Sequence, residues 1–394
     1  MRIRISAFYY MLLFLWSISE TASMASINAD ITIVATFDAL IWVAIRCYIP
    51  LKIIFEIKKY SWREIAVLIA IATVGYFSSF YSESGFLTAA FWFIAGAKGI
   101  DWKKAVKLLL KAQIIALIII ISCCFMGILP DNSKMGTDSG NVVSGIGHSL
   151  GYYHPNDLAG NVLQIVLMML YVMKRPLRLR VPAAFLSIAV ITYLITKSGT
   201  SSCLIVFISL MLVFFSVGEN GNIIGNFISE NLAKALKYVV VVLAICSVLF
   251  SVRQDIGESI LGDFHSRIAQ MAAYFAYYKI TPWGQPLLNH TSIDYDWRTN
   301  LYTLDNAYVH LLLGFGYVVF TLFILFYIRL IWRTYKSKQY VLLLILVTYA
   351  VLGFTETMFI RVQYNFTILL FAQIIWNNKL DDTVYSSDRL GEFS

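Results

Sequence analysis

Several residues that could do chemistry lie in two polar segments of an otherwise apolar chain, at 130–157 and 253–305. These segments, or the ends of the apolar runs beside them, hold all five histidines: His148, His154, His265, His290 and His310. Imidazole and carboxylate groups accept protons, and guanidinium groups bind phosphate in a bidentate way. The two segments therefore predict a polar site that combines proton transfer with anion binding.

The first polar segment ends in His154, Pro155, Asn156 and Asp157, directly before an apolar run. Asn and Asp are common helix caps and Pro suits the first turn, so the motif predicts a helix start. In a second interpretation, His154 is also an acid/base group and Asn156 a substrate contact. The residues alone leave both interpretations open.

The second polar segment begins with Arg253 and carries apolar residues at helical spacing directly after Arg267. These residues are Ile268, Met271, Ala272 and Phe275. The spacing predicts an amphipathic helix on a membrane surface, with Trp283 as an interfacial anchor. Arg267 would then lie at the depth of lipid headgroups, where a guanidinium can hold a phosphate. The alternative is an arginine that only extends its side chain toward the headgroups.

Two further polar groups lie where a loop meets an apolar run. Asp305 and Asn306 precede the run that contains His310. Asp305 is either a helix cap or a general base, and a helix N-terminus is expected to lower its pKa and weaken it as a base. Glu356 and Arg361 flank a short turn, across which we expect them to pair with each other.

The elements that must position these residues are membrane-spanning helices. The chain has 394 residues, of which 59% are hydrophobic and only 14% charged, and its mean hydropathy is +0.71. A soluble domain has about 25% charged residues, and no soluble fold of this length can bury so much apolar surface. The composition predicts an all-α, polytopic integral membrane protein and excludes disordered, collagenous and disulfide-rich classes.

At roughly 20 residues per span, we expect about twelve transmembrane helices, or about eleven if the first is removed as a signal peptide. The predicted spans are 6–22, 32–51, 64–80, 85–97, 109–129, 158–173, 181–196, 203–217, 236–252, 306–328, 340–355 and 363–377. Most of the 31 lysines and arginines then fall on one side, which predicts that both termini and this side are cytoplasmic.

The net charge of +8 is therefore a topology signal, and it does not indicate a nucleic-acid partner. The polar segments at 130–157 and 253–305 become outer loops, and the outer side is net acidic. No broad positive field draws an anion to that side. Any anion binding there must come from one or two individually placed arginines.

Several other chemistries have no sequence signature in this chain. It contains no P-loop, no HExxH and no Rossmann glycine fingerprint, and its cysteines form no CxxC pair. Asp294 and Asp296 flank Tyr295, but this acidic pair falls in an outer loop, away from any cytosolic sugar nucleotide. We therefore expect an outward-facing site that uses no metal and no cofactor.

Four short motifs carry a family resemblance: GYYHPNDLAGN, TKSGTSS, the element from Arg267 to Pro282-Trp283-Gly284, and LDNAYVHLLLGFG. In this order and spacing they resemble the bacterial Wzy-type polysaccharide repeat-unit polymerases, which are relatives of the O-antigen ligases. The likeness covers most of the chain, including the enlarged outer loop late in the sequence.

The resemblance implies a single C-type glycosyltransferase-like membrane domain over 1–394 in the bacterial cytoplasmic membrane. It implies transfer of a growing glycan from undecaprenyl diphosphate to the hydroxyl of an incoming lipid-linked repeat unit, on the outer face, in capsule, exopolysaccharide or O-antigen synthesis. A flippase and a chain-length regulator are the implied protein partners.

The resemblance also distributes roles among the candidate residues. Arg267, helped by Arg253 or Lys197, would hold the departing diphosphate. Asp305, His154 or His310 would take the acceptor proton. The residues expected to contact substrate are Asn156, Trp283, Asn306, Glu356 and Arg361.

Two departures from the ligase pattern favour a polymerase. The small-residue turn Lys197-Ser198-Gly199 lacks the arginine that ligases carry, and Asp305 stands where ligases have a histidine before Asn306. The alternatives that remain are a ligase-like glycan transferase, a lipid-linked oligosaccharide flippase or transporter, and a membrane scaffold without catalysis. A transporter would be expected to show internal repeats and charges along the bundle interior.

Overall fold

The computed structural model describes residues 5–25, 32–131, 148–172, 230–261, 265–288 and 303–376. This part of the chain is built from helices, and its one β-type contact is an isolated bridge between Ala25 and Tyr152. The α-helices are α1 (Ile5–Ser23), α2 (Thr32–Phe55), α3 (Trp62–Ser82), α4 (Thr88–Ala95), α5 (Trp102–Phe125), α6 (Pro155–Val172), α10 (Glu230–Leu236), α11 (Val239–Val252), α12 (Gln254–Ile260), α13 (His265–Tyr277), α14 (Ala307–Gly314), α15 (Gly316–Lys336), α16 (Tyr340–Leu352) and α17 (Phe371–Ile375). Short 3₁₀ turns lie at η1 (Ile57–Lys59), η3 (Thr357–Ile360) and η4 (Phe366–Leu370).

Five helical segments in the described ranges are long and apolar enough to cross a membrane: Val34–Phe55, Trp62–Ser82, Trp102–Phe125, Lys234–Val252 and Gly316–Lys336. Large apolar side chains stand exposed along them, among them Leu40, Ile69 and Ile118. A soluble protein would cover such side chains, so the prediction of a helical membrane protein is confirmed. The predicted spans 181–196 and 203–217, together with Lys197, lie outside the described residues.

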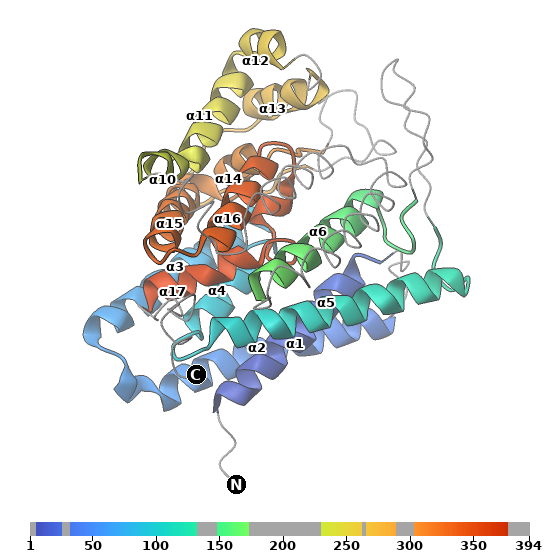
Figure 1. Cartoon of the computed structure of the whole chain (residues 1–394), viewed down its shortest axis with the longest axis vertical. Helices are drawn as coiled ribbons and strands as arrows, with labels where there is room; N and C mark the ends of the chain where they lie inside the picture. Colours follow the sequence, from blue (N-terminus) through green and yellow to red (C-terminus); the bar gives the residue numbers. More distant parts are fainter. Residues whose placement is uncertain are drawn as a thin grey trace, which may run out of the picture.

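The helices form a bundle in which sequence-distant segments lie together (Figure 1). α1 packs along α2 and α5, and α6 packs on α5. α15 and α16 pack against each other, and α11 contacts both of them as well as α14. The helices α12 and α13 pack on α11 at the edge of the bundle (Figure 1), and α13 also reaches α14.

The predicted span 306–328 is interrupted in the structure. It is divided into α14 and α15 at Gly316, whose φ is +83°, and a Cβ there would lie 2.4 Å from the Pro282 carbonyl oxygen. Gly284 has a φ of +92°, and a Cβ there would lie 1.9 Å from the Gly314 carbonyl oxygen. Backbone hydrogen bonds join residues 281–285 to residues 314–317. They run from the Gln285 amide to the Gly314 carbonyl (3.1 Å) and from the Tyr317 amide to the Thr281 carbonyl (3.0 Å). Both glycines are required because only they tolerate this backbone and this proximity.

The structure also differs from the prediction beyond α16. We expected spans at 340–355 and 363–377 around a short outer turn, but residues 353–370 form turns and 3₁₀ helix, and Phe359 and Ile360 are fully buried. Side chains bind this irregular backbone: Gln113 donates to the Gln363 carbonyl (3.0 Å), and Asn365 donates to the Phe359 carbonyl (2.7 Å). Irregular backbone is tolerated at membrane depth only when protein or a water-filled cavity surrounds it.

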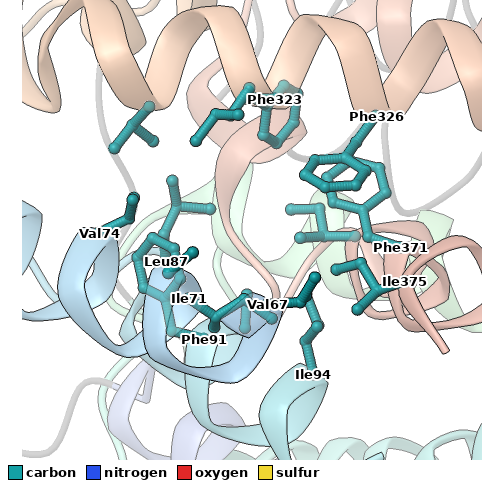
Figure 2. A pocket seen from close by; sticks show the side chains of 15 residues that line it. Val67, Ile71, Val74, Leu87, Phe91, Ile94, Phe323, Phe326, Phe371 and Ile375 are labelled. Atoms are coloured by element: carbon teal, nitrogen blue, oxygen red, sulfur yellow. The ribbon is translucent and has the colours of Figure 1, made fainter. Parts of the chain in front are cut away.

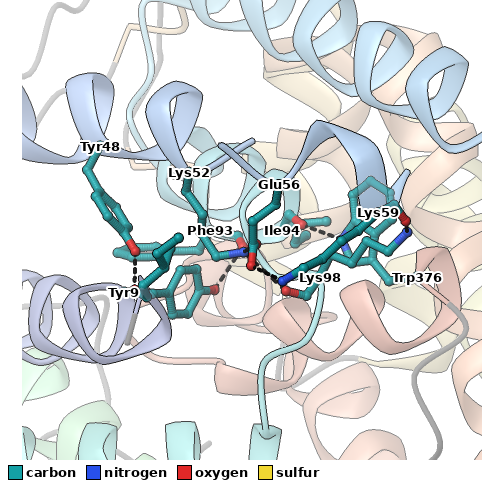
Figure 3. Close-up of polar contacts among 10 residues, drawn as sticks. Tyr9, Tyr48, Lys52, Glu56, Lys59, Phe93, Ile94, Lys98 and Trp376 are labelled. Atoms are coloured by element: carbon teal, nitrogen blue, oxygen red, sulfur yellow. Dashed lines mark hydrogen bonds and ion pairs between the residues drawn. The ribbon is translucent and has the colours of Figure 1, made fainter. Parts of the chain in front are cut away.

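A network of ion pairs among Lys52, Glu56, Lys59, Glu64 and Lys98, which we call the Lys52 clasp, lies at the end of the bundle that the charge distribution predicts to be cytoplasmic (Figure 3). The buried Lys52 ammonium pairs with Glu56 (2.8 Å) and donates to the Lys98 carbonyl (3.1 Å). Glu56 also pairs with Lys59 (2.6 Å), and Lys98 pairs with Glu64 (2.7 Å). The clasp ties α2, η1 and α3 to the turn between α4 and α5, and it lets a lysine be buried because each charge has a partner.

Candidate functional site

The centre of the candidate site is an ion pair between two sequence-distant segments. Arg267, on the first turns of α13, places Nη2 3.1 Å from Oε1 of Glu356, and its Nη1 donates to the Thr355 carbonyl. Glu356 is only 4% exposed. A carboxylate this deeply buried needs a cation beside it, so the pair fixes the guanidinium against the segment that follows α16.

The apolar face of α13, which carries Arg267, packs on α11 and α14. The next residue, Ile268, is fully buried, as are Met271 and Tyr274 further along α13. They form one apolar cluster with residues of α11 and α14, including Val309. The amphipathic helix expected after Arg267 is therefore present as α13, but its apolar face packs on protein and not on the membrane surface. Local periodicity does not distinguish these two coverings.

Asp305 is held beside this ion pair by its neighbour Asn306. The Asn306 side chain caps α14, accepting from the Val309 amide (2.9 Å) and donating to Ser247 and to the Phe354 carbonyl (2.9 Å each). Burial, and then the negative charge of Glu356, raise the pKa of Asp305 to about 7, against the opposing effect of Arg267 and Arg361. The expectation of a lowered pKa from the helix N-terminus is therefore wrong, because burial outweighs the helix dipole.

Arg361 stands over an aromatic platform on the other side of the same segment. Its guanidinium carbon lies 4.0 Å from the centroid of the Phe86 ring, and the Phe86 ring stacks on His310 at 5.3 Å. Within the described part of the chain, the buried Nε of Arg361 and the buried Nδ1 of His310 have no hydrogen-bond partner. His310 is only 7% exposed. The stack holds a cation in place without neutralising it.

The remaining segment of the site region is the start of α6. The helix starts where the motif predicts, but the His154 imidazole caps it in place of Asn or Asp, with Nδ1 accepting from the Asn156 amide at 3.0 Å. Three residues after His154, Asp157 accepts a hydrogen bond from the Tyr364 hydroxyl at 2.5 Å. This contact ties α6 to the segment that carries Arg361.

Two candidates have other neighbours. Arg253 makes a bidentate, largely exposed pair with Asp255, at 2.9 and 2.7 Å. Trp283 stacks on Phe77 of α3, with ring centroids 5.1 Å apart. The expected pairing of Glu356 with Arg361 gives way to the pair with Arg267, because the residues between them form the buried turn η3 rather than a surface turn.

The structure thus brings together Arg267, Asp305, Glu356 and Arg361, which we call the charged cluster, with Asn306 and His310 alongside. Sequence reasoning missed Phe86 and Tyr364. An aromatic residue in an apolar run is ordinary core material, so Phe86 carries no signal. Tyr364 lies three residues after Arg361, which is the one hint that the sequence offers.

The charged cluster can bind an anion through two guanidinium groups and exchange a proton through Asp305 near neutral pH. Among the described residues, no group of three or more His, Cys, Asp or Glu side chains is arranged to hold a metal ion. Comparison with known proteins gives no match, whether to a family model, to a curated protein or to a solved structure.

Proposed function

We propose that this protein is a glycosyltransferase of the Wzy type, which polymerises lipid-linked oligosaccharide repeat units on the outer face of the bacterial cytoplasmic membrane. The observation that carries the proposal is the charged cluster. Residues from three separate parts of the sequence supply two guanidinium groups and a carboxyl group whose pKa is about 7. Such a cluster suits a reaction that expels a diphosphate and releases a proton.

The bonds and charges of the reaction balance within this cluster. The acceptor hydroxyl oxygen forms a bond to the anomeric carbon of the donor glycan, and the bond from that carbon to the diphosphate oxygen breaks. The hydroxyl proton goes to Asp305, which must be unprotonated beforehand. The leaving undecaprenyl diphosphate gains one negative charge as Asp305 loses one.

The charge on the cluster therefore changes in step with the charge on the leaving group. Before transfer, Arg267 and Arg361 balance Asp305 and Glu356. After Asp305 is protonated, the cluster carries a net charge of +1, which stabilises the extra charge on the diphosphate. Charge stabilisation of this kind, in a site that excludes water, is usually the largest single contribution to catalysis.

The proposal includes the finer topology. About twelve spans would place both termini and the Lys52 clasp inside, and the charged cluster outside. Substrate would enter from the outer leaflet as a lipid-linked repeat unit, supplied by a flippase, and a chain-length regulator would act on the product. The enzyme would need neither a metal nor another cofactor, because the arginines supply the positive charge.

The test is polymerisation by the purified protein in detergent, with undecaprenyl-diphosphate-linked repeat units and no membrane potential. We expect longer lipid-linked glycans with the native chain, and their formation slowed about 10²–10⁴-fold with Asp305→Asn. Glycan moved to a different acceptor would indicate a ligase. Unaltered substrate that crosses the bilayer of proteoliposomes would indicate a transporter, and either result would contradict the proposal.

A further inference from the structure

An apolar cavity of about 270 Å³ lies between α3, α4, α15 and the η4–α17 segment (Figure 2). All 15 side chains that line it are apolar, and four of them are phenylalanines: Phe91, Phe323, Phe326 and Phe371. The cavity is open along part of its surface. Cavities with such walls do not hold water, but they do bind hydrocarbon.

The cavity is elongated along the helices. Val67 and Val74 of α3 both line it, and at 1.5 Å per residue they are about 10 Å apart along the helix axis. Val319 and Phe326 of α15 have the same spacing. Both helices are long and apolar enough to cross a membrane, which would place the cavity alongside the lipid chains.

The cavity adjoins the charged cluster at Leu87, through the preceding residue Phe86. Leu87 lines the cavity, and Phe86 directly before it lies under the Arg361 guanidinium and stacks on His310. An occupant could therefore have its hydrocarbon part between α3 and α15 and its charged part at Arg361.

We infer that this cavity is the binding site for the cluster-proximal part of the polyprenyl chain of the lipid diphosphate substrate. The inference rests on the proposed function, which supplies a lipid with an anionic diphosphate head. Because a cavity of about 150 Å³ binds one benzene molecule, this one has room for about ten carbon atoms, or two isoprene units. The rest of the chain would pass through the opening into the bilayer.

Two alanines on α3 provide a matched pair for the test. Ala70 lines the cavity and Ala72 does not, and both side chains are exposed. Ala70→Phe fills the opening without overpacking the core, and Ala72→Phe makes the same change on another face of the helix. We expect Ala70→Phe to raise the KM for the lipid-linked repeat unit about tenfold, equivalent to two buried methylene groups. Ala72→Phe should leave the KM unchanged.

Photo-crosslinking tests occupancy without any turnover. Benzoylphenylalanine is placed at Ala70 or at Ala72 in the full chain in nanodiscs, with radiolabelled geranylgeranyl diphosphate as the probe. We expect about tenfold more labelling at 70 than at 72, displaced by undecaprenyl diphosphate but not by phosphatidylglycerol. Adding Arg361→Gln should weaken labelling by the diphosphate but not by geranylgeraniol, because only the diphosphate uses the guanidinium.

Equal labelling at both positions, or equal displacement by phosphatidylglycerol, would overturn the cavity assignment. Polymerisation is measured on the native chain in the same nanodiscs, so that the two proposals fail separately. Activity without selective labelling overturns the cavity assignment alone. Selective labelling without activity overturns the proposed reaction, while the cavity remains a polyprenyl diphosphate site.

Discussion

Removing the Arg267 guanidinium should slow polymerisation strongly, for a reason that can be separated from its effect on stability. Arg267→Met keeps the length and packing of the side chain but leaves the Glu356 carboxylate without its cation. A second substitution, Glu356→Leu, then removes the buried charge itself. If Arg267 acts on the substrate, the double variant regains stability and stays inactive.

The size of both effects follows from the geometry. The side chains of Arg267 and Glu356 are 30% and 5% exposed, so the pair lies between a surface pair, worth about 0–1 kcal/mol, and a buried pair, whose breakage costs about 3–5 kcal/mol. We expect Arg267→Met to destabilise the fold by about 2 kcal/mol, which lowers the unfolding midpoint by a few degrees. Loss of a charge-stabilising donor should slow polymerisation about 10²–10³-fold.

Thermal unfolding in detergent, followed by tryptophan fluorescence, measures the stability of each variant, and gel analysis of lipid-linked glycans measures the rate. Arg63→Met, at an exposed position on the first turn of α3, controls for the loss of an arginine. The double variant should recover most of the lost stability, because apolar residues often replace a buried ion pair without cost. A double variant that polymerises at half the native rate or more would show that Arg267 serves only to neutralise Glu356, and the diphosphate role would be wrong.

Further predictions concern the base, the glycine contact and the aromatic platform. Asp305→Asn should slow polymerisation about 10²–10⁴-fold in the same gel assay, and more than His154→Asn does; the reverse order would make His154 the base. The native polymerisation rate should fall as the pH is lowered through about 7, because burial and Glu356 raise the pKa of Asp305 to about 7 and its protonated form cannot accept a proton. A rate that stays constant between pH 6 and 8, about one pKa unit on either side, would exclude Asp305 as the general base. Gly316→Ala should lower the unfolding midpoint and the polymerisation rate together, because at a φ of +83° its Cβ would lie 2.4 Å from the Pro282 carbonyl oxygen. An unchanged midpoint would show that residues 281–285 can move freely away from residues 314–317. Phe86→Leu should weaken substrate binding about fivefold by removing a cation–π contact worth about 1 kcal/mol, and an unaltered KM would remove Phe86 from the site.

The helices were predictable where contact with lipid alone requires the backbone to form its own hydrogen bonds. Long apolar runs such as 64–80 and 109–129 appear as α3 and α5, because a chain in hydrocarbon must satisfy its own backbone and can do so locally. The cap of α3 was equally local, since Ser61 and Glu64 form a capping box. The predictions that failed depend on other segments. Nothing local reveals that residues 281–285 dock at Gly316, or that the backbone after α16 is enclosed by protein.

The same limit applies to the charged cluster. Arg267, Asp305, Glu356 and Arg361 stood out because ionisable residues are costly at the edges of apolar runs. Their arrangement did not, since Arg267 and Glu356 are 89 residues apart in the sequence. The sign of the pKa shift of Asp305 was also out of reach, because burial is a tertiary property. Phe86 was missed for the opposite reason: its residue type is unremarkable and only its neighbours make it useful.

The irregular segment after α16 has a consequence for how the chain is made. The Gln363 carbonyl accepts a hydrogen bond from Gln113 of α5, and η4 packs on α4. The segment therefore cannot enter the membrane as an independent helix. It must wait until α4 and α5 are in place, and its position late in the sequence means that the ribosome delivers it after them. Topology reporters fused within 353–376 would therefore report an incompletely assembled protein, whereas reporters fused after α15 would not.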